Sequence, residues 1–227
     1  MVRVKVCGIR TLKEGLWAIE AGADALGFVF HPGSRRYVEP GRVRAITAEL
    51  PPFVASVGVF VDQPREVVEN LVVNCGLTAA QLHGSEQPRD WRGCWFPLIK
   101  ALKMPPAGQA TMQVRANENN LSSFPEEFSA WQGIARAILL DSTRGGQFGG
   151  TGTVLPWADE LLQSWVTSIK EAGFQVILAG GLTAENVREG IRLIRPYAVD
   201  VSSGVERDGQ KDQALLRKFL QQALTAV

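Results

Sequence analysis

Two residues have the chemistry of a proton-transfer pair, and each stands at the end of a short apolar segment. Cys7 ends the run that begins at Arg3, and Asp141 ends the run that begins at Ala137. A thiol near cationic groups can ionise and act as a base, and a partly desolvated carboxyl can donate a proton near neutral pH. Each residue also has an ordinary interpretation, Cys7 as a small buried hydrophobe and Asp141 as a loop-capping carboxylate. From these residues alone, both interpretations stay open.

Glycine-rich segments follow three later apolar runs. They are Gly149–Gly152, Gly180–Gly181 and Ser202–Gly204. Glycine lets backbone N–H groups approach a phosphate closely, and the loops after the last two strands of a (β/α)8 barrel are a recurrent phosphate site. Ordinary turn glycine is the alternative for any single pair. Because two consecutive segments share the pattern, we favour a phosphate site.

Two adjacent arginines and one histidine follow other apolar runs. Most paired arginines on a surface are simply solvated, but a guanidinium at a barrel mouth can hold a carboxylate through two hydrogen bonds. Arg35 or Arg36 could therefore orient an acidic substrate. His83 could move protons near neutral pH, but a hydrogen-bonded loop histidine is the commoner case. We assign no chemistry to His83.

The elements that must position these residues are short β-branched runs alternating with stretches of helical periodicity. This alternation predicts serial βα units and a parallel sheet. An open doubly wound sheet would alternate in the same way. The count of eight runs, with polar motifs after most of them, favours a closed α/β architecture, a single (β/α)8 TIM barrel over residues 1–227. The predicted strands are Arg3–Val6, Ala25–Phe30, Val54–Val61, Ala79–Leu82, Leu98–Leu102, Ala137–Asp141, Gln175–Ala179 and Ala198–Val201.

Helical periodicity is clear at four places between these strands. We expect Asp62 and Thr183 to lie near N-terminal caps, because short polar side chains can accept hydrogen bonds from the free N–H groups of a first turn. Proline and asparagine interrupt residues 104–133, which predicts a loop with a poorly patterned fifth helix. The predicted helices are Leu12–Ala21, Arg65–Cys75, Ala184–Ile194 and Asp212–Ala223.

Composition excludes several classes of function. The 227 residues contain 24 Lys and Arg against 23 Asp and Glu, so no global field favours nucleic acid or an anionic membrane, and affinity for anions must be local. Cys7, Cys75 and Cys94 form neither a disulfide framework nor a metal-binding pair, and His31 and His83 are too few for a zinc site. No apolar run is long enough to span a bilayer. We expect a reduced, cytoplasmic protein, a monomer or homodimer, without metal, nucleic-acid or membrane partners.

Taken together, the segments resemble those of phosphoribosylanthranilate isomerases. Any one motif is weak, but the set covers nearly the whole chain, in order and at appropriate intervals, and is highly specific. The segments that carry the resemblance are Lys5–Ile9, Ala21–Phe30, Ser34–Val38, Val57–Val61, Gln81–Gly84, Gly149–Gly152, Leu178–Leu182 and Val199–Glu206.

The resemblance implies a phosphorylated small-molecule substrate, N-(5′-phosphoribosyl)anthranilate. It also implies an Amadori rearrangement, an aldose–ketose isomerisation that yields 1-(2-carboxyphenylamino)-1-deoxyribulose 5-phosphate in tryptophan biosynthesis. By resemblance Cys7 is the general base, Asp141 the general acid, and Arg36 rather than Arg35 contacts the anthranilate carboxylate. No metal or organic cofactor is implied, because the protonated imine is the electron sink. The implied phosphate-binding residues are Gly150, Gly152, Gly180, Gly181, Ser203 and Gly204.

The sequence departs from the family pattern at two places. Arg10 stands where a small polar residue is commoner, which could change the charge beside Cys7, and residues 104–133 are longer and less regular than usual.

Other phosphate-binding barrels of amino-acid biosynthesis are the nearest alternatives. An indole-glycerol-phosphate synthase or a histidine-pathway isomerase would carry a catalytic lysine or two aspartates at its strand ends. A dual-substrate isomerase also stays open. A catalytically silent phosphate-binding barrel would have no use for Cys7 and Asp141.

Overall fold

The barrel forms because eight short strands pair side by side in chain order. In the computed structural model, which describes residues 1–104, 127–142 and 156–226, strands β1 to β8 are parallel and the last one pairs with the first. The eight strands are β1 (Arg3–Cys7), β2 (Ala25–Val29), β3 (Ala55–Phe60), β4 (Ala79–Leu82), β5 (Leu98–Met104), β6 (Ala137–Ser142), β7 (Gln175–Leu178) and β8 (Ala198–Val201). All eight predicted strands are confirmed, each within two residues at either end.

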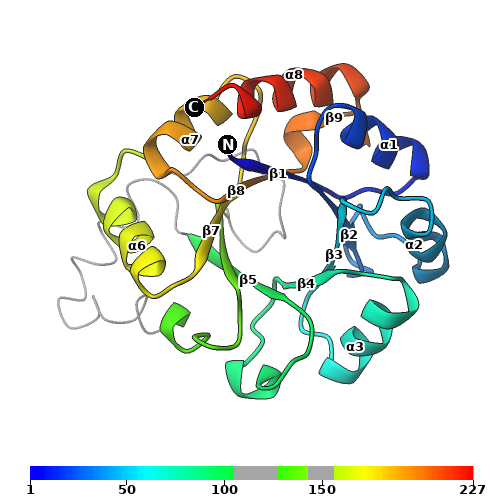
Figure 1. The fold of residues 1–227 in the computed structure, drawn as a ribbon, viewed down its shortest axis with the longest axis horizontal. Coiled ribbons are helices and arrows are strands. Elements are labelled where there is room, and N and C mark those ends of the chain that lie inside the picture. The colour runs from blue at the N-terminus through cyan, green and yellow to red at the C-terminus, as the bar shows by residue number, and fades with distance from the viewer. Residues whose placement is uncertain (105–126, 143–155, 227) are drawn as a thin grey trace.

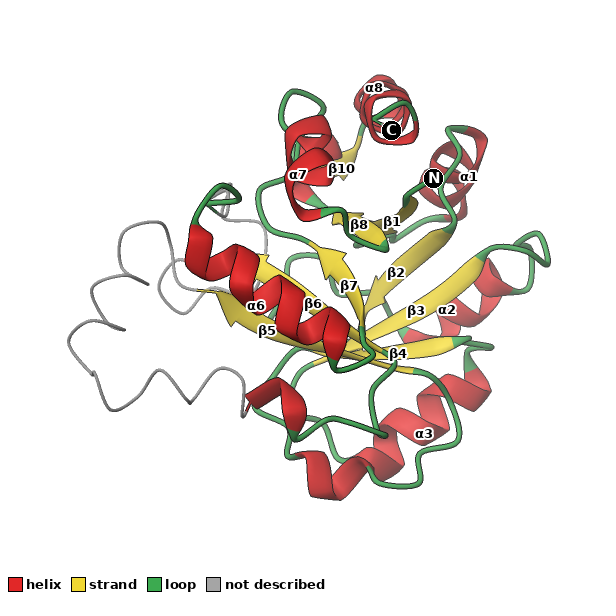
Figure 2. Ribbon diagram, turned by 60° about the vertical axis from the view of Figure 1, so that its left-hand side comes forward, coloured by secondary structure: helices red, strands yellow, loops and turns green. Residues whose placement is uncertain are grey.

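Helices surround the strands, as the view down the barrel shows (Figure 1). Seen from the side, they lie on the outer surface of the sheet (Figure 2). The short helix η1 follows β4, and η2 with a small hairpin of β9 and β10 lies between β8 and α8. The elements are α1 (Leu12–Glu20), α2 (Pro40–Thr47), α3 (Arg65–Asn74), η1 (Pro88–Trp91), α6 (Glu160–Glu171), α7 (Val187–Ile194), η2 (Ser203–Val205), β9 (Glu206–Arg207), β10 (Gln210–Lys211) and α8 (Gln213–Leu224).

The four predicted helices are present, but neither Asp62 nor Thr183 is itself the N-cap residue. Helix α7 begins at Val187 with Asn186 as its N-cap, so the helix starts later than expected. Thr183 instead accepts a hydrogen bond from the backbone of Glu185 in the turn before the helix. The N-cap of α3 is Pro64, and Asp62, at a positive φ of 52°, accepts a hydrogen bond from the backbone N–H of Ser85.

The predicted irregular segment, 104–133, lies mostly outside the described residues. Met104 belongs to β5, and after the gap Phe128 and Trp131 are buried. Within the described part of the chain, no helix has the length and apolar character needed to cross a membrane.

The side chains of each strand alternate between two environments. In β1, Val4 and Val6 belong to the large apolar cluster between strands and helices, whereas Cys7 packs with Val29 and Val59 in a separate small cluster. Successive side chains of a strand point to opposite faces, so Lys5 and Cys7 share the inner face of the barrel. Among the buried polar residues of the strands, Lys5, Gln81, Asp141 and Asp200 lie on the inner face, whereas Ser56 and Lys100 alternate with inward neighbours and lie on the outer face.

A first prediction concerns the end of α7. Arg195 is exposed and ends the helix at φ 47° and ψ 55°, a left-handed conformation that glycine adopts without steric penalty. We expect Arg195→Gly to stabilise the protein by roughly 0.5–1 kcal/mol. The matched control is Arg192→Gly, also exposed but within the helix, which should destabilise by about 1 kcal/mol. Urea unfolding measures both, and a loss of stability in Arg195→Gly would contradict the argument.

Candidate active site

One cavity at the mouth of the barrel brings together residues from seven strands or their following loops. It encloses about 760 Å³, including open solvent at its entrance, and its wall contains Cys7 and Asp141. The parallel strands end at the same rim, so residues far apart in the sequence converge there. The predicted residues in its wall are Cys7, Arg36, Asp141, Gly180, Gly181 and Ser203.

Cys7 lies beside a buried ion pair. The Nζ of Lys5 is 2.9 Å from Oδ2 of Asp200, and both side chains are almost fully buried. Burial raises the pKa of the Cys7 thiol above its ordinary value, since it disfavours the thiolate. The charges of Lys5 and Lys211 oppose that effect, whereas the charge of Asp200 adds to it. The groups around Cys7 therefore decide how readily it can accept a proton.

Asp141 is buried next to His83. The Nε2 of His83 is 3.2 Å from Oδ2 of Asp141, a contact that is an ion pair only when the imidazole is protonated and that lacks the alignment of a hydrogen bond. The other ring nitrogen, Nδ1, lies 3.0 Å from the side-chain amide nitrogen of Gln81. With that amide as donor, Nδ1 is the acceptor and the proton sits on Nε2, which faces Asp141.

The loop that carries His83 is held by a buried carboxylate. Both Glu86 side-chain oxygens accept a hydrogen bond from the backbone N–H of Gly84, and one of them also accepts from Asp62. Lys100 pairs with the same carboxylate at 2.7 Å, and both side chains are about 5% exposed. This clamp fixes the backbone directly after His83.

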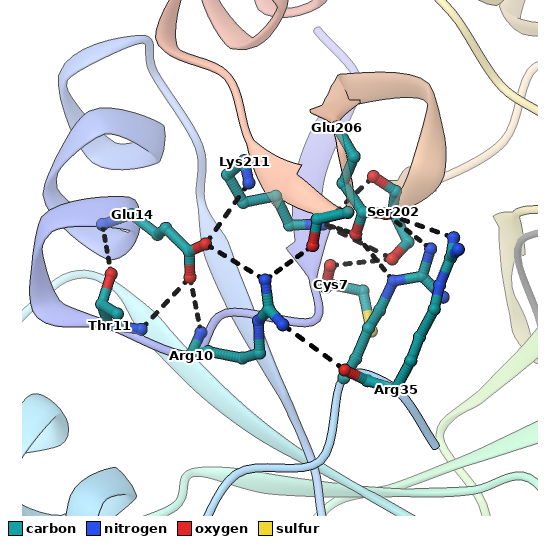
Figure 3. Close-up of polar contacts among 10 residues, drawn as sticks. Cys7, Arg10, Thr11, Glu14, Arg35, Ser202, Glu206 and Lys211 are labelled. Carbon is teal, nitrogen blue, oxygen red and sulfur yellow. Dashed lines mark hydrogen bonds and ion pairs between the residues drawn. The ribbon is translucent and has the colours of Figure 1, made fainter.

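Arg36 is held rigidly by Glu206. Its Nε and Nη2 each donate a 2.7 Å hydrogen bond to a different oxygen of the Glu206 carboxylate. Lys211 binds the same carboxylate at 2.9 Å, and Figure 3 shows Glu206 and Lys211 beside Ser202, which donates to the carbonyl oxygen of Cys7. Burial opposes ionisation of Glu206, but the hydrogen bonds of Arg36 and the charge of Lys211 outweigh it and lower the Glu206 pKa to about 2.

The two adjacent arginines differ in environment. The Arg36 side chain is 7% exposed and belongs to the cavity wall, whereas that of Arg35 is 63% exposed. Within the described residues, the Arg36 side chain donates hydrogen bonds through Nε and Nη2, and none is found for Nη1. Of the two arginines, Arg36 is therefore the one that belongs to the cavity.

Arg10 is not among the residues of the cavity wall. Its Nη2 donates to the carbonyl oxygen of Gly209 at 2.6 Å, and its Nη1 lies 3.4 Å from the carbonyl oxygen of Arg35 (Figure 3). Arg10 and Thr11 both donate backbone hydrogen bonds to Glu14. Arg10 therefore joins three loops outside the cavity, and the expected change of charge beside Cys7 is not found.

The loops after β7 and β8 approach each other closely. Gly180 has φ 82°, and a side chain there would overlap Ser142. A side chain at Gly204 would overlap the carbonyl oxygen of Leu182, so glycine is required where the two loops meet. Gly181 and Ser203 belong to the cavity wall, whereas Gly204 stands behind it. Gly150 and Gly152 lie outside the described residues.

Sequence reasoning missed several polar residues around the cavity. Lys5, Gln81 and Asp200 are polar residues inside otherwise apolar strands, which is a signal that could have found them. Glu206 and Lys211 come from β9 and β10, and nothing in the sequence indicates that they reach Arg36. In the described part of the chain, no group of three or more His, Cys, Asp or Glu could hold a metal ion.

The chain is similar throughout its length to one family of enzymes. A family model described as N-(5′-phosphoribosyl)anthranilate (PRA) isomerase matches residues 4–222. The isomerase of that name from Desulfitobacterium hafniense strain Y51 is 45% identical, with 98% of each chain covered. The crystal structure of phosphoribosyl anthranilate isomerase from Thermotoga maritima has a TM-score of 0.80, 37% identity and 99% coverage of both chains.

A further solved structure of such an isomerase contains a ligand. It is described as a complex with reduced 1-(o-carboxyphenylamino)-1-deoxyribulose 5-phosphate, and it matches with a TM-score of 0.77, 36% identity and 99% coverage of both chains.

A second prediction concerns the ionisation of Cys7. Because the charge of Lys5 favours the thiolate, Lys5→Met should move ionisation of Cys7 to higher pH. Ultraviolet absorbance of the thiolate against pH measures this, with the same titration of Cys7→Ser subtracted to remove Cys75 and Cys94. The variant must be shown to be folded, since an unpaired buried charge costs about 3–5 kcal/mol. If the midpoint of the Cys7 titration in Lys5→Met is unchanged or lower, Lys5 does not favour the thiolate and the prediction is wrong.

A third prediction concerns Glu206. Its pKa is about 2 in the folded protein, below the ordinary value of 4.5, so it stabilises the fold above its unfolded pKa and loses this effect as pH falls. The difference in unfolding free energy between wild type and Glu206→Gln should be large at about pH 7 and much smaller at about pH 3. Urea unfolding measures it, with exposed Glu49→Gln as control. A difference independent of pH would contradict the role of Glu206.

Proposed function

Since the chain belongs to the N-(5′-phosphoribosyl)anthranilate isomerase family, we propose that Cys7 and Asp141 are the base and acid of its Amadori rearrangement. The chain is an isomerase of tryptophan biosynthesis. The substrate of the proposed reaction is N-(5′-phosphoribosyl)anthranilate. The product is 1-(2-carboxyphenylamino)-1-deoxyribulose 5-phosphate.

Asp141 acts first in the proposed mechanism. It donates a proton to the ring oxygen of the ribose as the bond between that oxygen and C1′ breaks. The lone pair of the substrate nitrogen forms a C=N bond with C1′, which gives a protonated imine. His83, whose Nε2 is 3.2 Å from Asp141, lies next to the group that gains negative charge in this step.

Cys7 acts second. Its thiolate removes the proton from C2′, the C–H electrons form a double bond between C1′ and C2′, and the imine electrons return to nitrogen. The resulting enolamine tautomerises to the ketone. The protonated imine is the electron sink, so this chemistry calls for no metal or organic cofactor.

The two ends of the substrate are held by different loops. Arg36, fixed by Glu206, presents its remaining nitrogen to the anthranilate carboxylate. Gly180, Gly181 and Ser203 bind the phosphate through backbone N–H groups and a hydroxyl, with Gly204 allowing the two loops to meet. Gly150 and Gly152 remain predicted members of the phosphate site.

One observation carries this proposal. The thiol, the carboxyl and the buried guanidinium lie in the wall of the same cavity as the glycine loops after β7 and β8. A protein that only bound a phosphate ester would need the loops but not the acid and the base.

A fourth prediction tests the acid and base. Freshly prepared N-(5′-phosphoribosyl)anthranilate is supplied to the wild type, Cys7→Ser and Asp141→Asn, and turnover is followed by loss of anthranilate fluorescence. Each substitution should lower kcat by about 10²–10⁴-fold, since general acid–base groups contribute that much. Circular dichroism and retained binding of a phosphate ligand show that the variants are folded.

Cys94→Ser and Asp24→Asn are the matched controls, because both residues lie away from the cavity, and they should keep the wild-type rate. A wild type without turnover that still binds the phosphate ligand would favour a silent binding protein. A wild type that turns over equally well after both substitutions would disprove the assignment of Cys7 and Asp141. Turnover of a histidine-pathway substrate would identify a dual-substrate isomerase.

A further inference from the structure

Buried polar atoms without a partner gather at one place in the molecule. Within the described residues, five buried side-chain atoms have no hydrogen-bond partner. Three of them, Oε1 of Gln81, Nε2 of His83 and Oδ1 of Asp200, belong to residues in the wall of the active-site cavity. Native proteins rarely leave buried polar groups unpaired, and exceptions concentrate where a ligand completes the bonding. The wall thus offers hydrogen bonds that the protein itself does not satisfy.

Unlike Gln81 and His83, Asp200 has a carboxylate with one oxygen already bound by a cation of the protein. Its Oδ2 receives the ammonium of Lys5 at 2.9 Å, and its side chain is 8% exposed. Lys5 and Asp200 are also register partners in the pairing of β1 with β8. The carboxylate therefore has one oxygen held by protein and the other, Oδ1, unpaired within the cavity wall.

Asp200 also neighbours the reacting thiol. Lys5 interacts with both Asp200 and Cys7, and all three side chains are buried together. Cys7 lies on the same face of β1 as Lys5, one step nearer the mouth. A substrate carbon placed for deprotonation by Cys7 must bring its own neighbouring atoms close to Asp200.

We propose that Asp200 is a substrate-binding residue whose free Oδ1 accepts a hydrogen bond from a donor flanking the carbon that Cys7 deprotonates. This inference rests on the proposed function, which supplies two such donors, the amine N–H on C1′ and the hydroxyl on C2′. A carboxylate beside the amine stabilises the positive charge that this nitrogen gains when the ring opens. A carboxylate bound to the hydroxyl orients C2′ towards the base.

Asp200→Asn changes the character of this contact with little change in shape. The asparagine amide has one acceptor and one donor group, and the ammonium of Lys5 requires the acceptor. The donor group then faces the cavity, so the substrate donor meets another donor. The charge of Asp200 opposes ionisation of Cys7, so the substitution favours the thiolate, and lost turnover cannot be due to a smaller fraction of ionised Cys7.

Binding of three ligands tests the proposal. The first is reduced 1-(o-carboxyphenylamino)-1-deoxyribulose 5-phosphate, the second has an ether oxygen in place of its amine, and the third lacks its 2′-hydroxyl. Isothermal titration calorimetry gives each Kd for the wild type, Asp200→Asn and the control Asp24→Asn, whose ion pair with Arg3 lies at the opposite end of the barrel.

We expect one of the two analogues to bind the wild type about tenfold more weakly than the parent ligand. Asp200→Asn should bind the parent about tenfold more weakly and show no further loss for that analogue. If the ether analogue binds more weakly than the parent to the wild type but equally well to Asp200→Asn, the amine is the donor. If the analogue without the 2′-hydroxyl behaves in this way, the hydroxyl is the donor. The control should reproduce the wild type.

The proposal fails if both analogues bind the wild type as tightly as the parent ligand does. It also fails if the analogue that binds the wild type more weakly than the parent shows the same loss of affinity in Asp200→Asn. If Asp200→Asn does not fold, a crystal structure of the wild type with the parent ligand decides the question. A ligand nitrogen or oxygen within hydrogen-bond distance of Oδ1 supports the proposal, and its absence overturns it.

Turnover separates this inference from the proposed function. Asp200→Asn should lower kcat by about 10²-fold in a wild type that is active. An inactive wild type overturns the proposed function itself. An active wild type matched by Asp200→Asn overturns only the role of Asp200.

Discussion

The ion pair between Lys5 and Asp200 is the interaction on which the active site depends. It joins the first and last strands of the barrel at the point where their pairing closes the ring. Removing two charges from water is costly, and a buried pair is often no more stabilising than well-packed apolar residues would be. The pair is better explained by what it does for Cys7, which it surrounds with one positive and one negative charge.

The cations near the cavity are bound to carboxylates in two separate groups rather than forming one positive field. Lys5 is matched by Asp200, and Arg36 and Lys211 share Glu206. With a formal net charge of +1, the chain has no global attraction for anions, so any affinity for an anionic substrate must arise locally. Because each cation is already bound to a carboxylate, its position is fixed before any ligand arrives, which lowers the entropy lost on binding.

Much of the fold could be predicted from the sequence because short β-branched strands and a common rim follow from local patterns. The positions of Cys7, Asp141 and Arg36 around one mouth are a consequence of parallel strand direction. The start of α7 could not be predicted, since the choice of Asn186 over Thr183 as N-cap depends on how the preceding loop folds against Gly181. The hydrogen bonds from Arg36 to Glu206 could not be predicted either, because the two residues are 170 positions apart in the sequence.

Closure of the barrel also bears on how the chain is made. Lys5 and Asp200 are separated by 195 positions, so β1 leaves the ribosome long before its partner β8 exists. Until then one edge of β1 has unpaired backbone groups, and its inward lysine has no counterion. An unpaired strand edge is a template for pairing with other chains, and long-range parallel pairing is slow. The newly made chain should therefore be most prone to aggregation during the last stage of its synthesis, when it would gain most from a chaperone.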